Sequence, residues 1–445
     1  MESGKSTPEA EGLRAGNWCA EELRRTDVLR PAAEMLAEGR TAMICGAEDA
    51  QKAWILKALQ EKPQPVVIIT PDQKSALRWE EDMQFFSPNT EILSFPVVEN
   101  ADFAVTFTGT EALRGRMRAL SVLLEGKAAV VLATASEAAQ LLPAPEKLLA
   151  EKLSVRLGDV LERETLLAQL TERGYERVDQ VERCGHFAVR GDIIDIFPIN
   201  ESHPYRVEFF DDEVDGIRQF DEDTQRSIAS AEAFFVFPLH ADTVEKDSLI
   251  SYAGKGLVVF DEPQRGEEEL KKYFREEKEN RKNSADWQQL AGSRRGKTLV
   301  FSLLNRKLPD IHIHGEWTWK GRAVTNFQRQ LPLFCDELSY HLDQGWRIGI
   351  VCANPSEKEE IASALRERNL FISDGPKEGG VWLTEGVVSK GFEFPALKLA
   401  LYASGDVLGA PKLRRRVRSA GKGQQIRFFS DLEQGDYVVQ RVHGI

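Results

Sequence analysis

The residues best placed to do chemistry form a possible phosphate-binding loop and, far along the chain, a possible magnesium-binding pair. The loop runs from Gly46 to Ala53, where the spacing follows the pattern G-x-x-x-x-G-K-[ST] between an apolar strand-like segment and a helical one. The pair is Asp261-Glu262, which ends a short apolar run. In a working site of this kind, backbone amides and a lysine hold phosphates while a hydroxyl and an acid hold Mg²⁺. These residues therefore raise the question of an ATP-hydrolysing enzyme.

Three departures from the pattern argue against a working ATP site. Gln51 replaces the glycine that lets the amides approach phosphate, and Ala53 replaces the hydroxyl that would hold magnesium. Glu48 and Asp49 add negative charge near the phosphates, which would cost about 1 kcal/mol or more per close pair. After the first glycine, Gly46, only Lys52 matches the pattern. We predict a degenerate phosphate loop that binds no nucleotide, and we interpret the acidic pair as vestigial.

A second candidate site lies in the middle of the chain and suits binding rather than catalysis. Gly174 ends a helical pattern, and the alternation that follows predicts short antiparallel strands with a turn at 191–192. Arg177 and Arg190 would lie on these strands, with Phe197 at the end of the same sheet. Arginines beside an exposed aromatic ring are typical of binding hot spots. The alternative is that Phe197 is core and both arginines are solvated surface charges.

The elements around these sites predict an α/β multidomain protein. Strand and helix patterns alternate over the first 150 residues, which indicates a helicase-like parallel sheet bearing the degenerate loop. A hairpin pattern then marks an inserted antiparallel α+β domain, and a small α/β domain follows. The predicted units are 1–150, the inserted domain at 151–245, a return to the first sheet at 246–325, the small α/β domain at 326–410, a basic linker at 411–427 and the start of a further domain at 428–445.

Composition excludes several classes of function. The chain has 445 residues and a net charge of -13, so it lacks the overall basic balance of a bulk nucleic-acid binder. Its five cysteines are scattered without a C-x-x-C pair, which predicts reduced thiols and no metal site. No apolar run approaches the roughly 20 residues that span a bilayer, so we expect no membrane contact and a cytoplasmic location.

The central motif carries a family resemblance. Tyr175-x-Arg177, then Phe187-x-Val-Arg190-Gly, then Ile-Ile-Asp-Ile-Phe-Pro at 193–198, resembles the domain 2 signature shared by UvrB and the bacterial transcription-repair coupling factors. The segment between Pro96 and Glu111 is too short for the long hairpin that UvrB threads between DNA strands. The stretches at 141–146 and 431–445 are similar to a Leu-Pro-Pro-Pro-Glu segment and to the first strands of the CarD-like RNA polymerase interaction domain of the coupling factors. The resemblance extends from about residue 25 to the end.

This resemblance implies a binding module with no catalytic residues of its own. In both families domain 2 docks on UvrA, so UvrA is the expected partner and Arg177, Arg190 and Phe197 the expected contacts, although Ala188 stands where UvrB has a further arginine. RNA polymerase would be contacted by the domain that begins near 428. The family is an ATP-dependent DNA translocase, but ATP, Mg²⁺ and the main DNA contacts belong to motor domains missing from this sequence. The alternatives are a UvrB-like damage-binding ATPase and an autoinhibitory scaffold for those motor domains.

Overall fold

The computed structural model describes residues 8–60, 62–97, 107–239, 247–276, 280–292, 294, 296–376 and 379–409. The predicted basic linker and the predicted start of a polymerase-binding domain lie outside these residues. Within them, no helix is both long and apolar enough to cross a membrane.

The first unit is built on a seven-stranded sheet in which every pair of neighbouring strands is parallel. The strand order is β15-β1-β14-β13-β2-β4-β3. Apolar runs such as β2 and β4 are buried along their whole length, as expected of a parallel sheet covered on both faces. The strands are β1 (Thr41–Cys45), β2 (Val66–Thr70), β3 (Glu91–Ser94), β4 (Ala129–Thr134), β13 (Leu257–Asp261), β14 (Thr298–Ser302) and β15 (Gly315–Thr318). The predicted return of the chain to this sheet after the insertion is confirmed.

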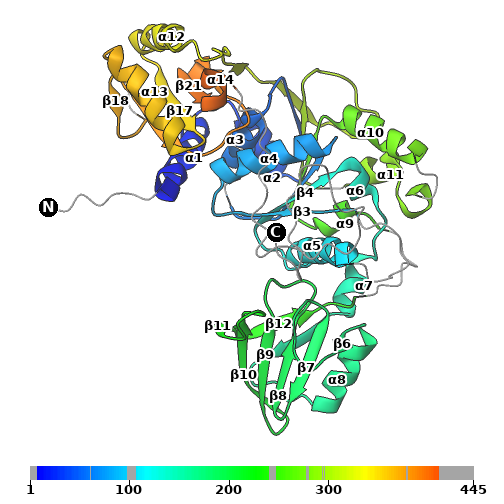
Figure 1. Cartoon of the computed structure of the whole chain (residues 1–445). Helices are drawn as coiled ribbons and strands as arrows, with labels where there is room; N and C mark the ends of the chain where they lie inside the picture. Colours follow the sequence, from blue (N-terminus) through cyan, green and yellow to red (C-terminus); the bar gives the residue numbers. More distant parts are fainter. Residues whose placement is uncertain are drawn as a thin grey trace, which may run out of the picture.

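Helices cover both faces of this sheet (Figure 1). One face packs against α1 (Pro8–Arg24), α2 (Arg30–Ala37), α3 (Ala50–Leu59) and α4 (Gln73–Phe86). The other packs against α5 (Phe107–Leu124), α6 (Ala135–Ala139), α7 (Pro145–Ala150), α9 (Leu249–Tyr252), α10 (Pro263–Glu276) and α11 (Trp287–Gly292), with a 3₁₀ turn η1 (Asn280–Asn283). Alternate residues of each strand point into the two layers, so Ile68 faces the first group and Val67 the second.

The inserted domain has its own six-stranded sheet, in the order β11-β10-β9-β8-β7-β6. Its elements are β5 (Leu153–Arg156), α8 (Arg163–Glu172), β6 (Glu176–Arg177), β7 (His186–Arg190), β8 (Ile193–Ile196), β9 (Tyr205–Phe210), β10 (Glu213–Phe220), β11 (Ser227–Ser230) and β12 (Ala233–Val236), with β5 paired to β12. Gly174 follows α8 with φ +86°, which confirms the predicted left-handed end of that helix. One expectation is wrong: β6 pairs with β7 in parallel, because the chain crosses back along residues 178–185 before β7 begins.

The inserted domain projects from the first unit and is attached to it by a shared apolar layer (Figure 1). Phe197, Ile199 and Phe220 of the insertion belong to the same buried cluster as Leu120 of α5. Arg114 of α5 donates hydrogen bonds across this contact to the backbone carbonyls of residues 201 and 202. The first unit thus covers one end of the insertion's sheet.

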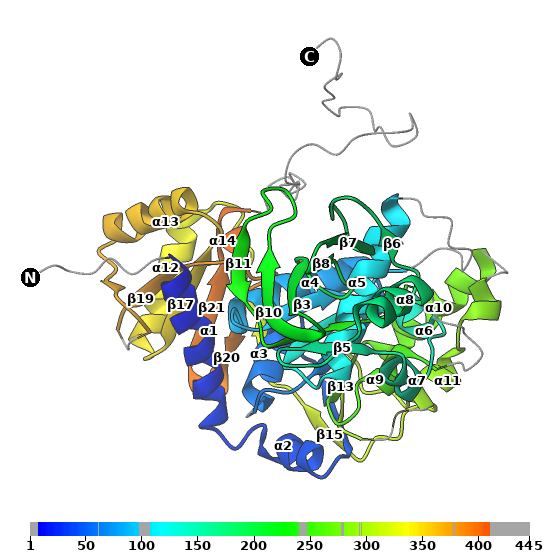
Figure 2. The same cartoon turned by 90° about the horizontal axis from the view of Figure 1, so that it is seen from below.

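The third unit is a small α/β domain with a mixed six-stranded sheet, ordered β16-β20-β21-β17-β19-β18. Its strands are β16 (Arg322–Ala323), β17 (Arg347–Cys352), β18 (Ile372–Ser373), β19 (Val381–Glu385), β20 (Phe392–Phe394) and β21 (Leu399–Ala403). Its helices are α12 (Leu331–Asp343), α13 (Pro355–Glu367), α14 (Ser404–Leu408) and the 3₁₀ turn η2 (Pro395–Leu397). Viewed from below, α1 of the first unit runs along this domain (Figure 2). Arg347 of β17 pairs with Glu22 of α1 at 2.6 Å.

Candidate functional site

The degenerate phosphate loop and the acidic pair meet in space, as their positions predict. The loop follows β1 and the pair ends β13, so both lie at the carboxyl edge of the parallel sheet. Lys52 Nζ lies 2.6 Å from Asp261 Oδ1 and 3.4 Å from Glu262 Oε1. The Lys52 and Asp261 side chains are only 12% and 6% exposed. Burial acts to lower the pKa of Lys52, but the two carboxylates outweigh it and raise the pKa above its ordinary value.

Two backbone amides of the loop around Lys52 form hydrogen bonds within the loop. The amide of Gln51 donates to the carbonyl of Glu48, and that of Lys52 donates to the carbonyl of Asp49. The Gln51 side chain is buried and accepts a hydrogen bond from the indole of Trp319 at 2.5 Å. A phosphate loop works because its amides converge on the anion, and here two of those amides bond within the loop instead.

Aromatic side chains fill the contact between this loop and the third unit. Trp319 stacks on Phe394 with ring centroids 4.5 Å apart, and Trp54 stacks on Phe392 at 4.8 Å. Trp54 is fully buried. The first and third units are thus joined by a packed apolar layer beside the loop. Of the remaining loop positions, Gly46 adopts φ +86° and Ala53 is fully buried.

The two arginines of the central motif are both exposed and lie at one edge of the insertion's sheet. Arg177 is on β6, the last strand in the sheet order. Arg190 ends the neighbouring strand β7, and its guanidinium donates to the backbone carbonyl of Asp179 at 2.8 Å. Asp179 lies two residues after Arg177, so this bond holds the end of the Arg190 side chain next to the β6 segment. We call this surface the β6–β7 edge.

Phe197 does not share that surface, which corrects the expectation of an exposed aromatic. Its side chain is only 1% exposed, and the guanidinium of Arg114 lies over the ring at 5.3 Å from the centroid. The alternation of the motif could not reveal this burial, because the cover comes from α5 of another unit. For Phe197, the alternative of a core residue agrees with the structure, and we do not carry it forward as a contact.

Other parts of the motif are structural. Asp195 is 2% exposed and accepts two hydrogen bonds from the guanidinium of Arg206, at 2.7 and 2.8 Å. A buried carboxylate needs such a partner, so the Asp195 side chain has a structural role within the sheet. The sequence alone did not separate this role from that of the exposed arginines.

A charged cluster that the sequence did not predict extends the β6–β7 edge. Arg183 donates from Nε to His186 Nε2 at 2.7 Å, and its Nη2 lies 3.4 Å from Glu176 Oε2. Burial, and then the neighbouring Arg183, lower the pKa of His186, so the ring is neutral and accepts this bond. The only sequence signal was the position of Arg183 between the two halves of the motif. It adds a third, half-exposed arginine to this edge.

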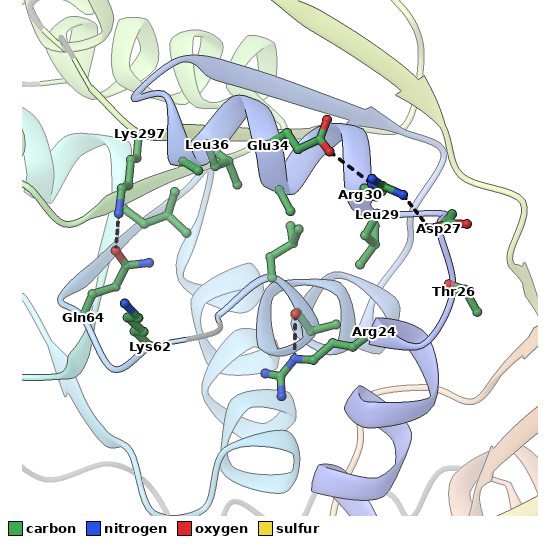
Figure 3. A pocket seen from close by; sticks show the side chains of 15 residues that line it. Arg24, Thr26, Asp27, Leu29, Arg30, Glu34, Leu36, Lys62, Gln64 and Lys297 are labelled. Atoms are coloured by element: carbon green, nitrogen blue, oxygen red, sulfur yellow. Dashed lines mark hydrogen bonds and ion pairs between the residues drawn. The ribbon is translucent and has the colours of Figure 1, made fainter.

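A cavity of about 730 Å³ lies away from both of these places, at the amino edge of the parallel sheet (Figure 3). Three of its cations are engaged by the chain's own groups: Arg24 donates to the carbonyl of Ala58, Lys297 donates to the amide oxygen of Gln64, and Arg30 pairs with Glu34. None of the predicted site residues lines it. The predicted site residues therefore lie outside this cavity, at the β6–β7 edge and at the contacts of the degenerate loop.

Comparison with known proteins shows what the chain is similar to. Residues 153–241 match the model of the UvrB interaction domain, and this segment contains the β6–β7 edge. A transcription-repair-coupling factor of Bacillus subtilis is 24% identical over 506 residues, covering 95% of this chain and 43% of that protein. Those of Haemophilus influenzae and Escherichia coli are each 31% identical, over 46% and 42% of this chain and 18% and 16% of their own lengths.

The chain spans less than half the length of these relatives. Among solved structures, a DEAD box protein of Methanococcus jannaschii aligns with 86% of this chain at 10% identity, with a TM-score of 0.26 that is too low to carry an argument. The sequence matches confirm the resemblance found in the motifs: over most of its length the chain is similar to transcription-repair-coupling factors, and its inserted domain matches the UvrB interaction domain.

Proposed function

We propose that this chain is a binding module that recruits UvrA through the β6–β7 edge of its inserted domain. The proposal rests on one observation: the exposed arginines of the motif, Arg177 and Arg190, lie inside the segment that matches the UvrB interaction domain. In this proposal, longer relatives join the module to RNA polymerase and to an ATP-driven motor, so that UvrA is brought to a stalled polymerase.

The structure supports this edge as a contact surface for physical reasons. Arg177 and Arg190 are exposed, and their guanidinium groups can each fork onto a carboxylate of a partner. The bond from Arg190 to the Asp179 carbonyl restrains one of these side chains before binding, which lowers the entropy lost on association. As the last strand of its sheet, β6 also leaves one side without a strand neighbour among the residues that the structure describes.

The test is the affinity of the chain for purified UvrA, measured beside an Arg177→Ala, Arg190→Ala variant. Truncating arginines at the centre of an interface typically costs 2 kcal/mol or more, so we expect binding to weaken at least about thirtyfold. Circular dichroism and the melting temperature should stay unchanged, because neither side chain is buried.

The matched control is Arg366→Ala, Arg368→Ala, which removes two exposed arginines from the third unit. A second control, Arg218→Ala, removes an arginine that pairs with Glu208 elsewhere on the same insertion. Both controls should bind UvrA as the unaltered chain does. If the controls weaken binding as much as the double variant, general charge rather than the β6–β7 edge explains the interaction.

We also propose that the chain binds no nucleotide of its own. Support comes from Lys52, which the acidic pair already holds, and from the loop amides, which bond within the loop. A titration of the chain with MgATP should give no binding heat and no change in melting temperature. Saturable binding would instead favour the UvrB-like ATPase.

A further inference from the structure

Three side chains that can ligate metal meet inside the third unit, away from the β6–β7 edge. Glu337 and His341 are four residues apart on α12, so they lie on the same face of that helix. Glu393 reaches them from β20. One ligand atom from each lies within 4.8 Å of the others. His341 and Glu393 are 6% and 5% exposed, so this is a buried cluster and not a set of surface acids.

One ring nitrogen of His341 lies within hydrogen-bond distance of a neighbour, and the other nitrogen makes no hydrogen bond that the described residues show. Nδ1 lies 3.3 Å from the hydroxyl of Tyr402, within hydrogen-bond distance. Nε2 lies 3.9 Å from Glu393 Oε1, which is too long for a hydrogen bond, and it has no other partner in the part of the chain that the structure describes. A nitrogen of a side chain that is more than nine-tenths buried therefore points, unbonded, at a carboxylate oxygen.

The charges of the cluster favour a cation. Glu337 and Glu393 are both acids, and Arg322 forms an ion pair with Glu393, through Nε to Oε2 at 2.6 Å. That bond leaves Oε1 of Glu393 facing His341 Nε2. The hydroxyl of Tyr402 lies a long 3.4 Å from Glu337 Oε1 and brings no charge. Two buried or half-buried carboxylates with one cationic partner leave a negative charge that water does not fully solvate.

We propose that Glu337, His341 and Glu393 bind a divalent transition-metal ion, with Zn²⁺ as the first probe. Nitrogen and oxygen ligands lie about 2.0–2.2 Å from zinc, so two tetrahedral ligands are about 3.4 Å apart. The 3.9 Å from Nε2 to Oε1 is close to that value. Tyr402 holds the outer nitrogen of the ligand histidine, which is the usual arrangement around metal-bound imidazole. Imidazole combined with carboxylate favours Zn²⁺ over Mg²⁺ or Ca²⁺.

The sequence did not predict this site, because Glu393 is separated from α12 by the intervening strands and helix of the third unit. The metal would cross-link α12 to β20 within the third unit. It would serve as a structural clasp with one coordination position left for water.

The experiment is a calorimetric titration of the chelator-treated, dialysed full chain with ZnCl₂, with MgCl₂ as the reference ion. We expect one Zn²⁺ per chain, a rise in melting temperature on binding, and no response to Mg²⁺. Changing residues that only support a ligand typically costs 10- to 100-fold in metal affinity, so Glu337→Gln and His341→Ala should each lose at least about 100-fold and Tyr402→Phe about 10-fold.

The matched control is His314→Ala, because His312 and His314 are two close histidines outside the cluster, with ring centroids 4.6 Å apart. This variant should bind Zn²⁺ as the unaltered chain does. The proposal is overturned if the unaltered chain binds no Zn²⁺, if Glu337→Gln binds it equally well, or if only His314→Ala loses it. Should His341→Ala fail to fold, Glu337→Gln decides, since its half-buried side chain tolerates an amide of the same shape.

Discussion

Replacing Lys52 by alanine should destabilise the first unit rather than abolish a nucleotide-dependent activity. In a working phosphate loop the lysine faces the nucleotide, but here it lies between Asp261 and Glu262. Lys52→Ala leaves two carboxylates with little access to water, and Asp261 then keeps the indole hydrogen bond from Trp79, at 2.9 Å, as its one side-chain partner among the described residues. Breaking a buried ion pair from one side typically costs about 3–5 kcal/mol.

The assay is differential scanning calorimetry of the whole chain at neutral pH. A unit of about 150–250 residues loses roughly 2–4 °C of melting temperature per kcal/mol, so we expect a drop of about 6–20 °C. Lys57→Ala is the matched control, since Lys57 is on the same helix and has no ion pair in the residues described by the structure. It should cost less than about 1 kcal/mol.

Adding Asp261→Asn to a Lys52→Met variant should recover part of the loss, because one of the two unpaired charges is then removed. Two results would refute this reasoning. One is a Lys52→Ala variant that melts within about 1 °C of the unaltered chain. The other is a rise in melting temperature with MgATP that depends on Lys52, which would mean that the lysine is free to bind phosphate.

Three further predictions concern buried side chains. Burial raises the pKa of Asp82 to about 7, although two hydrogen bonds from Ser389 act to lower this pKa. The folded protein therefore retains a proton that the unfolded chain releases above about pH 4. Its stability should fall as the pH rises from about 4 to 7. This loss amounts to up to about 4 kcal/mol in the free energy of unfolding, and Asp82→Asn should abolish it. The measurement is urea unfolding at a series of pH values, and the same pH dependence in the variant would contradict the prediction. Trp54→Ala should cost about 3–5 kcal/mol in the same assay, because it empties the layer between the first and third units; a loss below about 1 kcal/mol would contradict that packing. Phe197→Ala should be similarly costly, whereas Phe197→Leu should bind UvrA within about threefold of the unaltered chain, and a large loss of affinity without a loss of stability would restore Phe197 as a contact.

Local patterns predicted the elements of this protein well where one segment determines the outcome. Gly174 ends α8 as its position after an apolar-periodic segment indicates, and β2 and β4 are continuous apolar runs in a parallel sheet. The sequence placed the degenerate loop after one buried strand and the acidic pair at the end of another, and the structure adds the ion pair of Lys52 with Asp261.

Features that depend on contacts between units were not predictable in this way. Phe197 and Arg177 belong to the same motif, yet α5 covers the first and leaves the second exposed. The parallel pairing of β6 with β7 depends on how residues 178–185 cross, which alternation does not encode. The cluster around His341 requires the register of α12 against β20, and no spacing within the chain reveals it.

The most direct test of the central claim is the dissociation constant of this chain with UvrA, measured for the unaltered chain and for Arg177→Ala, Arg190→Ala in parallel. The account predicts binding by the unaltered chain and a loss of at least about thirtyfold in the variant. Equal affinity of the two forms would remove the β6–β7 edge as the docking surface, and no binding by either form would contradict the proposed recruitment of UvrA.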